Sequence, residues 1–184
     1  MRVITGEAKG RPLKVPKGTP TRPATELVRG AIFSILENMT DDWDKVLDLF
    51  SGSGSLGIEA LSRGAGWVDF FDREPVCCAT IRENLEKTRL DEYAHVYCAN
   101  VTKAISLLDK EYNIILLDPP FANPLIGELL VQLAGSKLVG PKTIVIATHP
   151  DYRPLDTTYG TLKKLKEHRH GGSCISVYRK ETMS

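Results

Sequence analysis

The sequence contains no long apolar segment. A helix that crosses a bilayer needs about 20 consecutive apolar residues, and no run in this chain of 184 residues approaches that length. The opening stretch, MRVITGEAKGRPLKVPKG, also lacks the apolar segment of a secretory signal peptide. With 42% hydrophobic and 26% charged residues, the composition is that of a globular protein. We therefore expect a cytoplasmic protein with no membrane partner.

Cysteine is scarce, and its spacing excludes the common cysteine sites. The chain has 4 cysteines, Cys77, Cys78, Cys98 and Cys174, and none of them forms a C-x-x-C pair. We therefore expect reduced thiols, no structural metal and no disulfide.

The chain also lacks an overall excess of charge of one sign, since its formal net charge is only +1. This balance hides a segregation along the chain. Residues 1–25 carry six Lys or Arg and one Glu, residues 163–184 carry six Lys or Arg and two acids, and residues 26–162 have a net charge of −8. Basic ends on an acidic body suggest contact with a polyanion.

After residue 24, apolar segments alternate between helical and strand patterns. Thr25 can cap a helix that runs to about Asn38. Further helices are expected at 55–64, 75–89, 102–108 and 124–138, and strands at 45–50, 67–72, 94–99, 113–118 and 143–148. Residues 161–170 and 173–180, joined at Gly171-Gly172, are typical of an antiparallel hairpin. The pattern predicts an α/β fold with a mostly parallel seven-stranded sheet, preceded by a basic N-terminal hairpin or extension (1–24) outside the main domain (25–184).

A glycine-rich loop follows the first of these strands. In LDLFSGSGSLGIEAL, Gly52, Gly54 and Gly57 form G-x-G-x-x-G between a strand and a helix, which permits a tight turn and close approach of a ligand to the backbone. Asp72 lies at the end of the second strand, twenty residues after Gly52, where a carboxylate accepts hydrogen bonds from ribose hydroxyls. The pattern predicts a cofactor that contains adenosine.

Asp48, just before the glycines, bears on the choice of cofactor. NAD and S-adenosylmethionine (SAM) both present a ribose to an acid such as Asp72. A dinucleotide adds an anionic pyrophosphate, whereas SAM carries a cationic sulfonium, which an acidic neighbourhood favours. The loop therefore favours SAM but leaves both cofactors open.

The segment Asp118-Pro119-Pro120-Phe121 follows the fourth strand, at the sheet edge where open α/β sheets bind ligands. A carboxylate and a backbone carbonyl can both accept hydrogen bonds from an amino group and orient its nitrogen. Two prolines lack N–H groups and fix φ, and an aromatic ring can stack on a flat base. We interpret these four residues as the catalytic clamp of an amino-group methyltransferase.

Along nearly the whole chain, the sequence resembles the RsmD-type methyltransferases, which methylate the N2 amino group of a guanine in small-subunit (16S) ribosomal RNA. RVITGEAKGRPLKVP and RPATELVRGAIFSIL match the family's opening elements, residues 47–65 match its glycine loop almost letter for letter, and Asp118 to Phe121 match its clamp. The closing HGGSCISVYRK resembles its final strand pair. The resemblance implies a Class I Rossmann-like fold, SAM as cofactor, S-adenosylhomocysteine as product and ribosomal RNA, free or in an assembled small subunit, as partner of a monomer.

The resemblance also implies roles for individual residues. The expected cofactor-binding residues lie in the glycine loop and after the next two strands: Asp48, Phe50, Gly52, Gly54, Gly57, Asp72, Arg73, Asn100 and Val101. The expected RNA-binding residues lie near the N-terminus: Arg2, Lys9, Arg11, Lys14, Arg22, Thr25 and Arg29. Three positions depart from the family, because Asn100 replaces an acid, Asp72 replaces the more frequent Glu, and ATHP (147–150) lacks the Glu that often follows the fifth strand.

Other functions remain open at this point. The clamp also fits DNA adenine or a protein glutamine as substrate. A nicotinamide dehydrogenase would leave the prolines without a role, and the intact Asp118 disfavours an RNA-binding module without activity.

Overall fold

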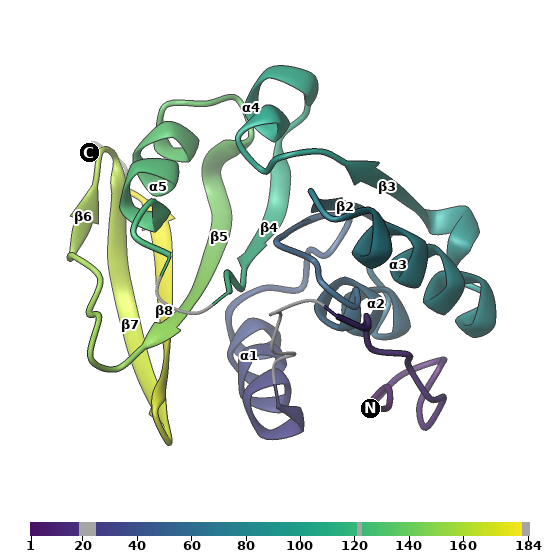
Figure 1. The fold of residues 1–184 in the computed structure, drawn as a ribbon. Helices are drawn as coiled ribbons and strands as arrows, with labels where there is room; N and C mark the ends of the chain where they lie inside the picture. Colours follow the sequence, from purple (N-terminus) through teal and green to yellow (C-terminus); the bar gives the residue numbers. More distant parts are fainter. Residues whose placement is uncertain (19–24, 121–122, 182–184) are drawn as a thin grey trace.

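The computed structural model describes residues 1–18, 25–120 and 123–181, which form one mixed sheet with helices on both faces (Figure 1). The strands are β1 (Lys45–Leu49), β2 (Trp67–Asp72), β3 (Ala94–Cys98), β4 (Tyr112–Leu117), β5 (Val139–Pro150), β6 (Thr158–Tyr159), β7 (Leu162–His170) and β8 (Ser173–Lys180). Their order is β3-β2-β1-β4-β5-β8-β7-β6. The first five strands pair in parallel, whereas β8 pairs antiparallel with β5, β7 with β8 and β6 with β7.

The helices are α1 (Glu26–Met39), α2 (Ser55–Ser62), α3 (Pro75–Thr88), α4 (Lys103–Leu107) and α5 (Ile126–Ala134), with a 3-10 turn at Asp91–Tyr93. Local sequence explains two of the starts: the Thr25 hydroxyl accepts a hydrogen bond from the Val28 amide at 3.2 Å, and Pro75 occupies the first turn of α3. In the described part of the chain, no helix has the length and apolar character needed to cross a membrane.

Two apolar cores cover the two faces of the sheet. Helices α1, α2 and α3 pack on one face through side chains such as Phe33, Ile58 and Ile81. Helices α4 and α5 pack on the other face through Ala104, Leu130 and neighbouring residues. Burial on both faces explains why β1 and β4 are almost continuously apolar. Because both faces are covered by apolar side chains, the C-terminal edge of the parallel strands is the part of the sheet where polar groups can gather.

The N-terminal extension is docked on α2 and α3. Val3, Ala8 and Leu13 are buried in the same core as these helices. The Glu59 carboxylate accepts hydrogen bonds from the Ile4 amide at 2.8 Å and the Thr5 amide at 3.0 Å. Side-chain and backbone contacts thus attach the extension to the main sheet layer.

The structure confirms the α/β order and corrects several boundaries. Within the described residues the sheet has eight strands instead of seven, because Gly160, with φ of 59°, lets Thr158–Tyr159 fold back on β7 as a short strand. Helix α5 ends at Ala134 instead of 138, since the Ser136 hydroxyl donates to the Leu133 carbonyl and turns the chain. Strand β5 runs from 139 to 150 because β8 supplies an antiparallel partner along its later half.

The predicted N-terminal hairpin is reduced to a single antiparallel bridge between Arg2 and Pro12. Gly6 and Gly10 take left-handed φ values of 90° and 83° and bend the chain into turns, and backbone hydrogen bonds join residues 1–3 to residues 10–13. The Ile4, Thr5 and Ala8 amides bond instead to the Glu59 and Ser62 side chains on α2. Tertiary contacts therefore supplement a short hairpin in this segment.

Candidate active site

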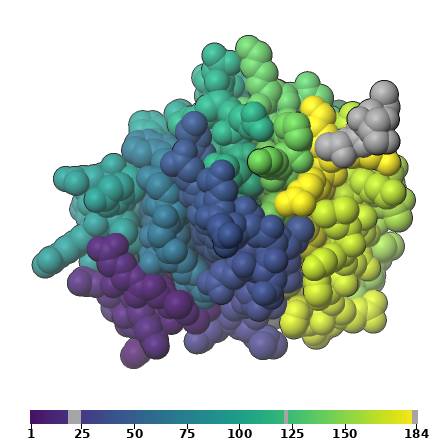
Figure 2. All heavy atoms as spheres, turned by 180° about the vertical axis from the view of Figure 1, so that it is seen from behind, coloured from purple at the N-terminus to yellow at the C-terminus, as the bar shows by residue number. Residues whose placement is uncertain are grey.

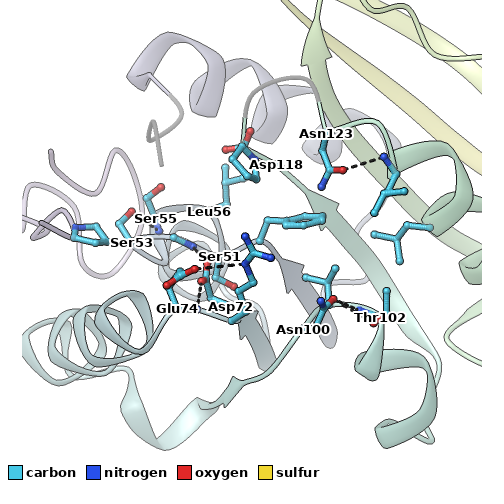
Figure 3. A pocket seen from close by; sticks show the side chains of 18 of the residues that line it. Ser51, Ser53, Ser55, Leu56, Asp72, Glu74, Asn100, Thr102, Asp118 and Asn123 are labelled. Atoms are coloured by element: carbon cyan, nitrogen blue, oxygen red, sulfur yellow. Dashed lines mark hydrogen bonds and ion pairs between the residues drawn. The ribbon is translucent and has the colours of Figure 1, made fainter. Parts of the chain in front are cut away.

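A cavity of about 410 Å³ opens at the C-terminal edge of the parallel strands (Figure 3). This volume lies within the usual range for small-molecule sites, about 300–1,000 Å³. Its lining comes from the N-terminal extension, the loops after β1, β2, β3 and β4, and one side of α5. These residues are Val15, Pro16, Phe50, Ser51, Gly52, Ser53, Ser55, Leu56, Asp72, Arg73, Glu74, Asn100, Val101, Thr102, Asp118, Pro120, Asn123, Leu125, Glu128, Leu129 and Gln132.

The loop after β1 is held in a tight conformation. Phe50 has φ of 60° although it is not a glycine, and Gly52 has φ of 58°; a left-handed φ is uncommon for a bulky residue and recurs at functional sites. The Gly52 amide donates to Asp72 Oδ2 at 2.9 Å, and the Ser51 amide donates to the Phe71 carbonyl at 3.0 Å. The end of β2 thus fixes the shape of the loop.

The three glycines have different surroundings. A Cβ on Gly52 would meet no protein atom within 4 Å, and Gly52 lines the cavity. A Cβ on Gly54 would lie 3.1 Å from Ile81, and one on Gly57 would lie 2.3 Å from the Phe70 ring. Only Gly52 therefore leaves room for a ligand, whereas Gly54 and Gly57 allow α2 to pack closely on its neighbours and do not line the cavity.

The two acids near this loop also differ. Asp72 lines the cavity, and its Oδ1 accepts from the Glu74 amide at 2.9 Å. A carboxylate has about four acceptor sites, so Asp72 can accept further hydrogen bonds. Asp48 is buried outside the lining, where Oδ2 accepts from the Gly57 amide at 3.0 Å and Oδ1 has no hydrogen-bond partner among the described residues. Burial raises the pKa of Asp48 well above the usual value, and the negative charges of Asp118 and Asp72 raise it further.

The predicted residues after β2 and β3 do reach the cavity. Arg73, Asn100 and Val101 all line it. Asn100 Oδ1 accepts hydrogen bonds from the Thr102 amide at 3.1 Å and the Thr102 hydroxyl at 3.2 Å. These bonds leave the Asn100 NH₂ group as a donor toward the cavity side.

Asp118 lies on the cavity wall opposite Asp72 and Glu74 (Figure 3). Its Oδ1 accepts a hydrogen bond from the Thr148 hydroxyl at 2.5 Å. Burial raises the pKa of Asp118 to about 6, and the bond from Thr148 opposes this rise. Pro120 lines the cavity, whereas Pro119 does not. Phe121 lies outside the described residues.

Most of the expected RNA-binding side chains are exposed, but Arg29 is not. Arg2, Lys9 and Arg11 are exposed on the extension. The side chain of Arg29 is only 1% exposed, lies 3.6 Å from Glu59 and donates to the Arg2 carbonyl at 3.0 Å. Because its charge is used inside the protein, we remove Arg29 from the expected set.

Lys14, Thr25 and Arg22 complete the expected RNA-binding set. Lys14 is exposed but pairs with Glu83 at 3.2 Å. The Thr25 hydroxyl caps α1. Arg22 lies outside the described residues.

Sequence reasoning missed Thr148 and the α5 wall formed by Leu125, Glu128, Leu129 and Gln132. Thr148 could have been found from strand order: β4 and β5 are adjacent and parallel, so the residues after Leu117 and Ala147 face each other. The α5 wall has no sequence signal of this kind, because it depends on how the loop after β4 places the helix.

Comparison with known proteins identifies the family. A family model described as Conserved hypothetical protein 95 matches residues 1–179. A protein of Bacillus subtilis named "Putative rRNA methyltransferase YlbH" is 35% identical over 183 residues, which cover 98% of this chain and 99% of that protein. The chain belongs to this family of RsmD-type methyltransferases. The family resemblance inferred from the motifs is thereby confirmed.

Further relatives agree in fold and in length. "Ribosomal RNA small subunit methyltransferase D" of Escherichia coli is 28% identical over 98% of this chain and 90% of that protein. The structure titled "Putative methyltransferase yhhF from Escherichia coli" superposes with a TM-score of 0.87 at 26% identity, covering 100% of this chain and 99% of that one. An RNA methyltransferase from Salinibacter ruber, solved with S-adenosylhomocysteine, has a TM-score of 0.67 at 18% identity over 89% of this chain and 97% of that one, and so supports the fold alone.

Proposed function

We propose that this protein transfers a methyl group from SAM to the N2 amino group of a guanine in small-subunit ribosomal RNA. The observation that carries the proposal is the position of the Asp118 carboxylate, which lines the same cavity as Gly52 and Asp72. Asp118, an acceptor for amino hydrogens, thus lines the same cavity as the glycine loop and Asp72, which can bind a nucleoside. The names of the relatives support ribosomal RNA as the substrate class.

The residues present fit SAM. Asp72 has free acceptor sites for ribose hydroxyls, Gly52 leaves open space where a side chain would project, and Asn100 offers an amide to the base. Val101 and Leu129 give the cavity apolar walls. When bound, SAM supplies an electrophilic methyl group. Asp48, buried below the loop, fixes the start of α2 through the Gly57 amide.

Asp118 would orient the guanine amino group. The lone pair of an exocyclic amine is delocalised into the ring, so the nitrogen must be held in line with the methyl donor, and alignment supplies much of the rate gain. The carboxylate can accept one amino hydrogen, while a backbone carbonyl of Pro119 or Pro120, which have no N–H of their own, can accept the other. With a pKa of about 6, Asp118 is mostly ionised at neutral pH and can accept the released proton.

The exposed cations of the extension would bind RNA phosphates beside the cavity. Arg2, Lys9 and Arg11 lie on the segment that continues into Val15 and Pro16, which line the cavity. Contacts to phosphates give affinity and register, while the base is read in the site. A guanine in a duplex has its amino group paired, so the target base must be unpaired or flipped out.

Transfer of labelled methyl groups tests the proposal. Purified protein is incubated with labelled SAM and either naked small-subunit RNA or assembled small subunits, and the product is digested to nucleosides. We expect labelled N2-methylguanosine. When DNA and protein are offered as alternative substrates, labelled N6-methyldeoxyadenosine or labelled N5-methylglutamine, with no transfer to RNA, would contradict it and assign the clamp to another amino substrate.

Asp118→Ala separates the clamp from the cofactor site. We expect at least a 100-fold loss of methyl transfer, because general acid–base and positioning effects are typically of this size, with S-adenosylhomocysteine affinity nearly unchanged. Asp109→Ala is the matched control, since Asp109 is 83% exposed and pairs with Lys137 on the surface. Equal activity of the two variants would exclude Asp118 from the reaction.

A further inference from the structure

Thr148 contacts Asp118 from the next strand of the sheet. β4 and β5 pair in parallel with Leu117 opposite Ala147, so that Asp118 and Thr148 follow side by side. The Thr148 oxygen lies 2.5 Å from Asp118 Oδ1 and 3.4 Å from the Leu117 carbonyl. A hydroxyl has a single proton, and the shorter contact to a charged acceptor identifies Asp118 as its partner.

The two residues differ in how firmly they are held. Thr148 is buried in β5, which is paired with β4 on one side and β8 on the other. As a β-branched residue, it has few accessible side-chain rotamers. Asp118 lies one residue beyond the end of β4, where the regular strand has ended. The fixed partner therefore determines the position of the less constrained one.

The bond occupies only one oxygen of the carboxylate. Among the described residues, no donor contacts Asp118 Oδ2, and Asp118 lines the cavity. A carboxylate held through Oδ1 presents Oδ2 at a defined place and angle. This is the geometry needed to accept a hydrogen from an amino group.

We propose that Thr148 is a positioning residue, which holds the Asp118 carboxylate through Oδ1, keeps it ionised and leaves Oδ2 for the amino group of the substrate. This inference rests on the proposed role of Asp118.

The effect on ionisation follows from the surroundings of Asp118. Burial raises its pKa to about 6, and the Thr148 bond lowers it. Loss of the hydroxyl would raise the pKa further. Other charged or titratable groups face the cavity or the adjoining strand ends: Asp48, Asp72, Arg73, Glu74, Glu128 and His149. These groups are the same in wild type and in a Thr148 variant. The difference between the pH profiles of the two proteins therefore measures the effect of the Thr148 hydroxyl.

The test is the pH dependence of kcat/KM for methyl transfer between pH 5 and 8.5. Thr148→Val removes the hydroxyl while keeping the branched shape, and Thr148→Ser restores it. Activity requires the ionised carboxylate, so it falls as the pH drops through the pKa. We expect the midpoint of this fall to move upward by about one unit in the Val variant, with about a fivefold loss at pH 6, and to return in the Ser variant.

Controls separate this proposal from general damage and from failure of the proposed function. Thr143→Val removes a hydroxyl that donates to the Tyr112 carbonyl at the other end of the same strand pair, and should leave the midpoint unchanged. Affinity for S-adenosylhomocysteine reports folding, and Thr148→Ala replaces the Val variant if that variant does not fold.

If the Thr148 variants keep the wild-type midpoint and rate while Asp118→Asn is inactive, the Thr148 proposal is overturned and the clamp stands. If Asp118→Asn is fully active, the proposed role of Asp118 fails, and the Thr148 proposal fails with it. If the wild-type protein forms no N2-methylguanosine from RNA, the proposed function itself fails.

Discussion

At the scale of single residues, one motif contains two kinds of glycine. Gly52 has a left-handed φ and open space where a Cβ would project into the cavity. Gly57 lies within α2, where a Cβ would approach the Phe70 ring and Asp48 Oδ2. Glycine in G-x-G-x-x-G thus permits ligand access at one position and close packing of the core at another.

Two alanine variants distinguish these roles. Gly57→Ala should lower the free energy of unfolding by about 1–3 kcal/mol, because the new methyl must displace a buried ring. Gly52→Ala should cost about 1 kcal/mol of stability through its φ, and should weaken S-adenosylhomocysteine binding more than tenfold. Denaturant unfolding and calorimetric titration measure the two quantities. Equal effects of both variants on binding, after correction for stability, would contradict the division.

At the scale of elements, the sequence predicted what depends on local periodicity. Continuous apolar strands and one-sided helices predicted β1 to β5, α1 to α5 and the final hairpin in their order. Features that depend on tertiary partners were not predicted: the extra strand β6 needs β7 beside it, and β5 is longer than expected because β8 pairs with it. Arg29 looked like a surface cation because no local pattern reveals its buried partner Glu59.

The candidate site also contains both kinds of residue, those that the local sequence predicted and those that depend on tertiary contacts. Asp72, Gly52 and Asp118 were predicted because each follows a strand, and the ends of parallel strands meet at one edge. Thr148 and the α5 wall were missed because they depend on the register between strands and on the path of a loop.

Asn84 of α3 links the extension to the glycine loop. Its side chain is fully buried, accepts from the Lys14 amide at 2.8 Å and donates to the carbonyls of Lys14 and Ser53 at 2.9 Å each. The Asn84 side chain therefore bonds to both the amide and the carbonyl of Lys14, as the backbone of a neighbouring strand would. Because Val15 and Pro16 follow directly and line the cavity, Asn84 connects an element of the expected RNA surface with the expected cofactor site.

Asn84→Ala should release the extension. Three backbone groups lose their partner, which should cost about 2–4 kcal/mol of stability, and limited proteolysis should cut within residues 9–18 faster than in wild type. S-adenosylhomocysteine binding should weaken because one cavity wall is lost. Asn38→Ala is the control, since the exposed Asn38 amide bonds only to the Ser34 carbonyl of its own helix. An unchanged cleavage rate in Asn84→Ala would show that other contacts hold the extension.

At the scale of the whole molecule, the basic ends of the chain lie apart. Figure 2 shows the N-terminal extension and the C-terminal strands on opposite sides of α1. The hairpin adds Lys166 and Arg169 as exposed cations on β7, next to the acidic central segment. An RNA that touched both ends would have to extend across the molecule, so the affinity should depend on phosphate contacts at separated places.

Salt dependence measures these contacts one cation at a time. The logarithm of the RNA association constant should fall linearly with the logarithm of salt concentration, with a slope set by the number of phosphates neutralised. Lys9→Ala and Arg11→Ala should each reduce the magnitude of this slope by about one, because both side chains are exposed and the Arg11 guanidinium donates to the Lys87 carbonyl instead of pairing with an acid among the described residues. Lys14→Ala should change it less, since Glu83 already neutralises Lys14.

Lys137→Ala is the matched control, because Lys137 is 82% exposed but belongs to the acidic central segment and pairs with Asp109. The salt dependence of RNA binding by Lys137→Ala should have the same slope as that of wild type. If Lys9→Ala and Arg11→Ala both give the same slope as Lys137→Ala, neither cation contacts a phosphate, and the RNA surface must be sought on β7 instead. Because non-specific attraction alone would respond equally to any exposed lysine, the difference between Lys9→Ala and Lys137→Ala separates a binding surface from net charge.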